Sequence, residues 1–234
     1  MRQIILDTET TGLEPERGHR IIELACLELV NRRFTRQSLH RYFNPEREID
    51  PAAQQVHGLT YEFLQDKPKF ADIADEFLAF IAGAELIIHN APFDVAFLDA
   101  ELARVGRGPL IEYCEGVTDT LRMAKTLHPG KRNGLDALCE RYMVDNSKRT
   151  LHGALLDAEL LGEVFLAMTR GQESLVIDTP ATESSSEPRW AMKQRSLVVL
   201  RASADELAGH LEQLEKINRA SQGGCLWLNL AAQQ

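Results

Sequence analysis

The sequence predicts an α/β protein with a mixed sheet flanked by helices, followed by a linker and a small C-terminal segment. Three observations lead to this fold class. Apolar runs rich in branched residues dominate the first 43 residues, apolar residues at helical spacing prevail between residues 72 and 168, and a polar stretch follows near residue 180. A chain of 234 residues is longer than one average domain and shorter than two. We therefore expect one large domain with an appendage.

Composition and charge narrow the functional classes. Hydrophobic residues make up 44% and charged residues 26%, which is typical of a globular protein. A net charge of −9 argues against a broad basic surface for duplex DNA, because such affinity comes mainly from Lys and Arg. It is compatible with an enzyme that holds a few nucleotides through metal ions. Every apolar run is shorter than the roughly 18–20 residues that span a bilayer. The sequence contains no C-x-x-C pair, so neither a zinc site nor a disulfide framework is expected. We expect a cytoplasmic protein.

The large domain begins with strands. Gln3–Glu9 is an apolar run that ends in acids, which indicates a buried strand whose end reaches a site. Ile21–Val30 predicts a second strand, and Asn31–Arg33 predicts a tight turn into a third strand over residues 34–43. Prolines punctuate residues 45–68, which we expect to be rich in loops.

Helices interleave with a strand in the second half of this domain. Residues 72–82 place apolar side chains at helical spacing with acids opposite. Leu86–Ile88 predicts a short buried strand, and Pro92 suits the first turn of the helix that follows it. A further helix is expected near residues 134–143. The last helix of the domain has apolar residues at steps of four and three, namely Ala154, Ala158, Leu161, Phe165 and Met168.

The C-terminal segment follows a change of composition. Residues 178–188 have almost nothing to bury and predict a flexible linker. Ser196–Leu200 predicts a strand, and Ser203 with Glu206 forms a capping-box pattern that opens a helix. A unit of about 40 residues is too small to hold a stable core unaided. Its apolar side chains therefore require a partner, and they are Leu207, Leu211, Leu214, Ile217, Leu226 and Trp227.

Candidate catalytic acids stand at the ends of the predicted strands. Asp7 and Glu9 are two residues apart, so strand geometry places both carboxylates on one face. Two such acids raise each other's pKa unless a cation lies between them. Asp94 falls in the first turn of a helix, where the helix dipole favours an anion. Considered alone, the pair of Asp7 and Glu9 fits an ordinary pair of surface acids as well as a catalytic pair. Asp94 alone fits a helix-capping acid as well as a catalytic one.

A histidine and a fourth acid follow at a spacing of five residues. His152 and Asp157 would lie about 140° apart on a helix, so they share no face if both are helical. They converge only if His152 lies in the loop or first turn before the helix, which Gly153 permits. Alone, this spacing arises readily by chance.

Together these residues resemble the DEDD superfamily of 3′→5′ exonucleases, in the branch with a catalytic histidine. The matching text is Leu6–Leu13, His89–Asp94 and His152–Asp157. Within that superfamily the chain resembles the epsilon proofreading subunits of bacterial DNA polymerase III. The additional matching segments are Val56–Gly58, Pro129–Leu138, Asp145–His152 and Gly223–Trp227.

The resemblance implies an RNase H-like fold with a mixed five-stranded sheet. It also implies two divalent cations, and carboxylate oxygens suit Mg²⁺ or Mn²⁺. In the family's pattern Asp7 bridges both ions, Glu9 and Asp157 complete one, and Asp94 helps to hold the other. His152 takes the proton from the attacking water, a task suited to an imidazole that titrates near neutrality.

The resemblance further implies a binding site for the terminal nucleotide. The residues expected to line that nucleotide are Thr10, Thr11 and Leu13, with Leu13 as an apolar wedge. The residues expected to shape the pocket for its base and sugar are His57, His89, Asn90 and Phe93. Four basic residues in loops either approach phosphates or form an ordinary solvated surface, and they are Lys131, Arg132, Lys148 and Arg149.

The function implied is removal of mispaired 3′-terminal nucleotides for a polymerase, with release of nucleoside 5′-monophosphates. An exoribonuclease that trims RNA ends is the alternative, because it would carry the same acids and histidine. The linker and tail favour proofreading, because a free-standing RNA-trimming enzyme has little use for a tethered partner-binding segment. A catalytically silent adaptor is a third class, and the intact set of acids argues against it.

The domain boundaries and partners follow from the same interpretation. We expect an exonuclease domain at 1–172, a linker at 173–189 and a polymerase-binding segment at 190–234. The expected partners are a single-stranded 3′ end of DNA, the alpha subunit of the polymerase, the sliding clamp and a small accessory core subunit. The expected clamp-binding peptide is extended and consists of Gln172, Leu175 and Ile177 with their neighbours.

Overall fold

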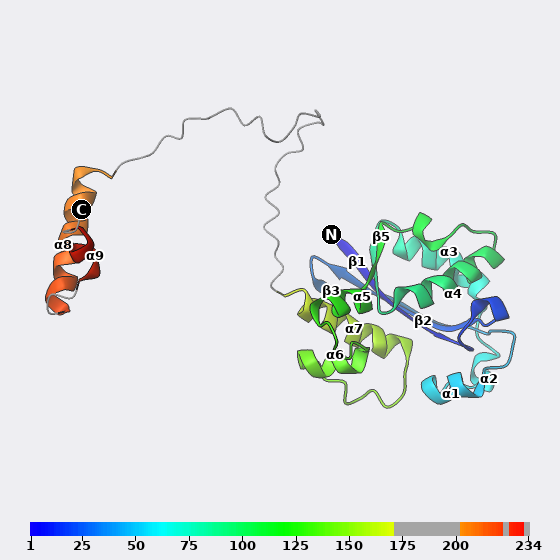
Figure 1. The fold of residues 1–234 in the computed structure, drawn as a ribbon. Coiled ribbons are helices and arrows are strands. Elements are labelled where there is room, and N and C mark those ends of the chain that lie inside the picture. Colours follow the sequence, from blue (N-terminus) through cyan, green and yellow to red (C-terminus); the bar gives the residue numbers. More distant parts are fainter. Residues whose placement is uncertain (171–201, 222–224, 232–234) are drawn as a thin grey trace, which may run out of the picture. The chain divides into compact units, whose positions relative to one another are not determined.

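The computed structural model describes residues 1–170, 202–221 and 225–231. It divides the chain into two compact units, 1–176 and 177–234, and each is considered by itself (Figure 1). No helix in these described ranges combines the length and the apolar character needed to cross a membrane. The expected clamp-binding residues, the linker at 173–189 and the predicted strand at 196–200 lie outside the described residues.

The larger unit is built on one five-stranded mixed sheet, as predicted. Its strands are β1 (Arg2–Thr10), β2 (Ile21–Val30), β3 (Arg33–Tyr42), β4 (Glu85–Ile88) and β5 (Gly116–Asp119). Their order across the sheet is β3-β2-β1-β4-β5. The pairs β1/β2 and β2/β3 are antiparallel, whereas β1/β4 and β4/β5 are parallel. Strand β1 therefore lies at the centre, with its carboxyl end beside that of β4.

Helices cover both faces of this sheet (Figure 1). They are α1 (Pro51–His57), α2 (Tyr61–Leu64), α3 (Phe70–Ile81), α4 (Ala91–Arg104), α5 (Thr120–Leu127), α6 (Leu135–Tyr142) and α7 (Ala154–Met168), with short 3₁₀ turns at Pro15–Arg17 and Leu110–Glu112. Alternate residues of β1 supply the two cores, because successive side chains of a strand point to opposite faces. Ile4 and Leu6 pack with α3 and α4, whereas Ile5 packs with α7.

The two helices within residues 45–68 had not been predicted. Pro51 occupies the first turn of α1, a position where its missing N–H costs nothing. Gly58 ends that helix with φ of 74°, in the left-handed region. Helix α5 and strand β5 had not been predicted either. Strand β5 has only four residues, all of intermediate burial, so it has no strong hydrophobic pattern.

The smaller unit contains α8 (Ala204–Ala220) and α9 (Leu226–Ala231). The predicted capping box is present, since Ser203 Oγ accepts from the Glu206 backbone N–H and Glu206 accepts from the Ser203 backbone N–H. The apolar run at 225–228 begins helix α9. Leu214 is buried, but most of the predicted apolar side chains of this unit are exposed, namely Leu207, Leu211, Ile217, Leu226 and Trp227.

Candidate active site

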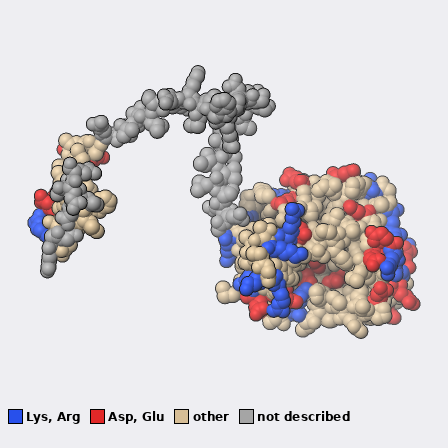
Figure 2. Space-filling model, in the orientation of Figure 1, with Lys and Arg blue, Asp and Glu red and all other residues tan. Residues whose placement is uncertain are grey.

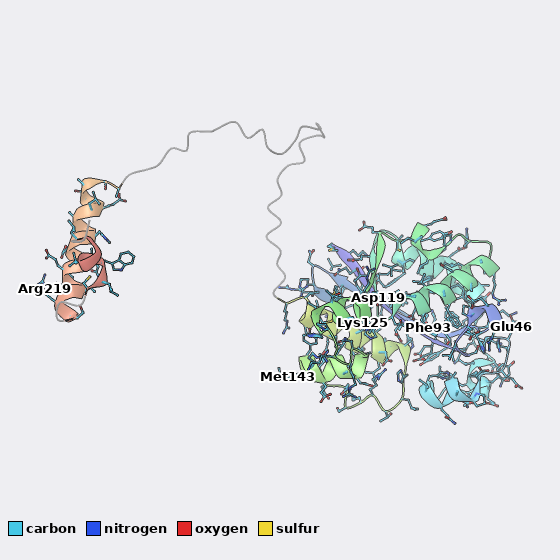
Figure 3. All side chains as sticks on the ribbon, viewed as in Figure 1. Glu46, Phe93, Asp119, Lys125, Met143 and Arg219 are labelled. Carbon is cyan, nitrogen blue, oxygen red and sulfur yellow. The ribbon has the colours of Figure 1, made fainter. Side chains whose placement is uncertain are left out.

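Parallel pairing of β1 and β4 brings two polar segments together. The register pairs Leu6 with Ile88, so Asp7 to Glu9 and His89 to Asn90 emerge at the same edge of the sheet. The end of β5 holds the second segment in place. Asn90 donates its backbone N–H to Asp119 Oδ1 at 3.1 Å, and His89 Nδ1 lies 2.9 Å from Thr120 Oγ1. Figure 3 shows Asp119 at the end of β5 and Phe93 on α4.

A left-handed turn delivers the third acid to this edge. Asn90 has φ of 65°, which lets α4 begin directly after β4. Pro92 lies in the first turn, as predicted, and Asp94 follows in the same turn with only 3% of its surface exposed. Thr8 donates both its backbone N–H and its hydroxyl to Asp94 Oδ1, at 3.1 and 2.7 Å. Asp94 is therefore attached to the strand that carries Asp7 and Glu9.

Helix α7 supplies the fourth acid and is preceded by the histidine. Asp157 lies in the first turn of α7 and is 4% exposed. Gly153 is the N-cap residue in extended conformation, so His152 lies outside the helix, which is the condition that its spacing from Asp157 requires. The Nδ1 atom of His152 lies 3.3 Å from Asp157 Oδ2. The backbone N–H of His152 donates to the Val56 carbonyl at 3.0 Å, which attaches this loop to α1.

The candidate acids and His152 line one cavity of about 900 Å³. The side chains around it come from β1, from the start of α4, from the start of α6 and from the loop before α7. They include Asp7, Glu9, Asp94, Asp157, His152, Leu13, His89, Asn90, Phe93, Asp136 and Arg149. A volume of this order is within the usual range for a pocket that holds a small molecule.

Burial and nearby negative charges raise the pKa values of Asp7, Glu9 and Asp94. The pKa of Asp7 is well above its ordinary value, first because of burial and then because of the charges of Asp94 and Glu9. Burial and the charge of Asp157 raise the pKa of Glu9 to about 8. Burial raises the pKa of Asp94 to about 7, against the opposing effect of its hydrogen bonds from Thr8. Such a cluster cannot be fully ionised at neutral pH without a compensating cation.

The donor set fits a divalent metal ion. Ligand atoms of Glu9, His152 and Asp157 all lie within 4.8 Å of one another, and the carboxylates of Asp7 and Asp94 line the same cavity. Carboxylate oxygens are the hard ligands that Mg²⁺ and Mn²⁺ prefer. The His152 imidazole also reaches the position between Glu9 and Asp157. The geometry is therefore compatible with an imidazole that lies beside a cation and with one that binds it.

The predicted substrate-binding residues divide into two groups. Leu13, 78% exposed, lies at the cavity together with His89, Asn90 and Phe93. The other three are buried and do not line the cavity. Thr10 Oγ1 donates to the Gly12 carbonyl, Thr11 Oγ1 lies 3.1 Å from His19 Nδ1, and His57 Nδ1 accepts from the Leu59 backbone N–H. Among the described residues, His57 Nε2 has no hydrogen-bond partner.

The sequence analysis missed residues that the structure places at the acids. Thr8 was overlooked between Asp7 and Glu9, although its position between two candidate acids was a usable signal. Asp136 lines the cavity. No role was predicted for it, although it lies within Pro129–Leu138, a segment that resembles the epsilon family. Arg149 had been assigned to a phosphate-facing or solvated loop, but its side chain is 6% exposed and turns toward Asp157. On the face in Figure 2, lysine and arginine gather on one side of the larger unit with some acidic side chains among them, and the middle of the face is mostly uncharged.

The chain is similar to known exonucleases and to subunits of DNA polymerase III. The sequence profile of the RNase_T exonuclease family matches residues 4–165. The chain is 49% identical to the DNA polymerase III subunit epsilon of Pasteurella multocida, over 97% of this chain and 93% of that protein. It is 48% identical to the same subunit of Escherichia coli, over 97% of both chains. The structure of exonuclease X in complex with 5′ overhanging duplex DNA shares the fold, with 24% identity, a TM-score of 0.58, and coverage of 73% of this chain and 92% of that one. Exonucleases of this family generally depend on divalent metal ions.

Proposed function

Because this chain belongs to the family of DNA polymerase III epsilon subunits, within the RNase_T exonucleases, we propose that it removes mispaired nucleotides from the 3′ end of DNA during replication. The observation that supports this most is the gathering of four carboxylates and a histidine around one cavity at the ends of β1 and β4. The relatives do not favour the alternative of an RNA-trimming enzyme, since they are polymerase subunits.

The acids are the residues that would hold the cations. Asp7 is central to the cluster and would contact both, Glu9 and Asp157 would complete one position, and Asp94 would contribute to the other. Bound Mg²⁺ or Mn²⁺ would supply charge stabilisation to the attacking and leaving oxygens of the phosphodiester. Without cations, the raised pKa values keep part of the cluster protonated at neutral pH. The acids therefore exchange protons for metal on binding.

His152 is the residue that would accept the proton of the attacking water. Its Nδ1 atom is the ring nitrogen beside the acids, 3.3 Å from Asp157 Oδ2. Its side chain is 47% exposed, so solvent and substrate can reach it. The carboxylate of Asp157 would stabilise the imidazolium formed by this transfer. Hydrolysis would release a nucleoside 5′-monophosphate and leave a new 3′ hydroxyl on the shortened strand.

The apolar and polar walls of the cavity would select an unpaired end. Exposed Leu13 and the ring of Phe93 both line the cavity, which suits contact with the face of an unstacked base. His89 and Asn90 are fixed by the end of β5 and would bond the base or sugar. Thr10, Thr11 and His57 are buried and do not line the cavity, so they would support its walls from the interior.

The C-terminal unit would attach the enzyme to its partners. Leu207, Leu211 and Ile217 expose apolar surface on α8, and Leu226 and Trp227 do so on α9. We assign this surface to the alpha subunit of the polymerase. The segment with Gln172, Leu175 and Ile177 would bind the sliding clamp as an extended peptide. Both attachments would keep the exonuclease at high local concentration beside the primer end.

Hydrolysis of end-labelled oligonucleotides tests this proposal. A single-stranded DNA with a 5′ label should shorten stepwise from its 3′ end in Mg²⁺, and the released product should co-migrate with nucleoside 5′-monophosphates. EDTA should stop the reaction, and an RNA of the same sequence should be a much poorer substrate. Shortening from the 5′ end, or a clear preference for RNA, would contradict the proposal.

A further inference from the structure

Arg149 binds the carboxylate of Asp157 with two parallel hydrogen bonds. Its Nε donates to Oδ1 at 2.6 Å and its Nη2 donates to Oδ2 at 2.7 Å. The arginine and aspartate side chains are 6% and 5% exposed, so the pair is shielded from solvent. A guanidinium is planar, and its forked donors match the geometry of a carboxylate. The pair therefore determines the orientation of the Asp157 carboxylate plane.

The same guanidinium joins two further parts of the site. Its Nη1 donates to Asp136 Oδ1 at 2.7 Å, in the first turn of α6. Its Nη2 also donates to His152 Nδ1 at 2.9 Å. Arginine can only donate, so Nδ1 of the imidazole accepts with its single lone pair, and this bond must open before Nδ1 can take a proton. One side chain therefore links α6, α7 and the histidine that precedes α7.

His152 and Asp157 need such a link. His152 lies outside the helix with a half-exposed ring, and the hydrogen bond to Val56 holds its backbone rather than its imidazole. Asp157 is buried near Glu9, and the two negative charges repel each other. The positive charge of Arg149 opposes this repulsion. The two hydrogen bonds use one acceptor position on each oxygen of Asp157, which leaves further positions for a cation.

We propose that Arg149 is a positioning residue for the metal site: its fork orients Asp157 and His152 toward Glu9 and thereby raises the affinity of the acid cluster for a divalent cation. The inference rests on the proposed function only in taking these acids as metal ligands. Partners that orient metal ligands typically contribute 10- to 100-fold in metal affinity or activity. Arg149 acts here through Asp157 and His152 and not through contact with substrate.

Titration of the full chain with Mn²⁺, followed by electron paramagnetic resonance, measures this affinity without any substrate. Arg149→Ala should bind Mn²⁺ about 10- to 100-fold more weakly than the wild type. Arg149→Lys should be nearly as weak, because an ammonium is a point charge without the planar fork. Millimolar guanidinium should restore part of the affinity of Arg149→Ala, whereas ammonium should not.

Arg20→Ala is the matched control. Arg20 donates through Nε and Nη2 to the two oxygens of buried Glu101, at 2.6 and 2.8 Å, so it makes a similar pair away from the acids. Its loss should lower the melting temperature and leave Mn²⁺ affinity unchanged. Circular dichroism identifies the folded variants, and Arg149→Lys decides the question if Arg149→Ala does not fold.

Three results would overturn the inference. Unchanged Mn²⁺ affinity in Arg149→Ala would show that the acids need no orientation. Tighter binding would show that Arg149 occupies the place of the cation. Full affinity in Arg149→Lys would show that charge suffices without the fork. A wild-type chain that binds Mn²⁺ but hydrolyses no DNA would refute the proposed function and would leave this comparison intact.

Discussion

Thr8 donates two hydrogen bonds to a single oxygen of Asp94, from its backbone N–H at 3.1 Å and from its hydroxyl at 2.7 Å. Thr8 stands between the acids Asp7 and Glu9 on β1, whereas Asp94 belongs to α4. The two bonds therefore join the acids of a strand to the acid of a helix that follows a different strand. They also lower the pKa of Asp94, which burial raises to about 7.

Thr8→Val should raise the pKa of Asp94 further, because the ionised carboxylate loses a hydroxyl donor while the side chain keeps its shape. A hydrogen bond to a charged group contributes about 1.5–3 kcal/mol, and one to a neutral group about 0.5–1.5 kcal/mol. Urea denaturation of the metal-free variant should therefore show a larger loss of stability at pH 8.5 than at pH 5. An equal loss at both pH values would show that the hydroxyl does not favour the ionised form.

The metal-free protein should lose stability as pH rises from about 5 to 9. Glu9 has a pKa of about 8 and Asp94 of about 7 in the folded chain, above their ordinary values of 4.5 and 3.8. Between these values the folded chain holds more protons than the unfolded chain, so rising pH favours unfolding. The melting temperature in EDTA should fall across this range, and less steeply in Glu9→Gln. Saturating Mn²⁺ should restore it at pH 8.5, and a pH-independent melting temperature in EDTA would contradict the electrostatic account.

His152→Ala should reduce turnover about 10²- to 10⁴-fold, the usual contribution of a general base. The variant should leave Mn²⁺ binding largely intact, because the imidazole is proposed to accept a proton and not to bind a cation. Asp7→Ala should instead disturb binding of both cations. Isothermal titration with Mn²⁺ separates the two roles, and loss of binding in His152→Ala would make the imidazole a ligand.

Mismatched 3′ ends should be hydrolysed much faster than matched ends by the isolated protein. The acids line a cavity that exposed Leu13 also lines, and we expect a base to reach it only after leaving the stack. Unstacking costs a few kcal/mol and costs least at a mismatch. Primer-template duplexes that differ only in the terminal pair measure this ratio. Equal rates on matched and mismatched ends would exclude selection by unstacking.

A chain that ends at residue 180 should keep full activity on free single strands and lose stable association with the polymerase. All the acids and His152 lie in the unit 1–176, whereas the exposed apolar side chains of α8 and α9 lie beyond it. Co-purification with the alpha subunit measures the association. Retention of the truncated chain on the polymerase, or loss of its activity while it remains folded, would contradict this division of roles.

Helices and strands with a regular spacing of apolar residues could be predicted from the sequence. Short elements, and elements that depend on their neighbours, could not. Strands β1 and β2 and helix α7 carry long apolar patterns that their burial confirms. Helix α1 starts at a proline, which was interpreted as a loop signal. Strand β5 has four residues and depends on its parallel neighbour β4 for its structure.

The convergence of the acids could be predicted because each lies near the end of a strand or opens a helix within a recognisable motif. The role of Arg149 could not. It stands next to Lys148 in a loop, and nothing in the sequence distinguishes the side chain that turns inward from its neighbour. Its partner Asp157 is eight residues away and Asp136 is thirteen away, so only the packing of α6 against α7 brings them together.

Metal-dependent hydrolysis at a 3′ end should require all four carboxylates around the cavity together. The most direct test is single-turnover release of the terminal nucleotide from a mismatched primer in Mg²⁺. The wild type is compared with Asp7→Asn, Glu9→Gln, Asp94→Asn and Asp157→Asn, all verified as folded. The account predicts rapid release of a nucleoside 5′-monophosphate by the wild type and almost none by any variant. Wild-type release by even one of these variants would contradict it.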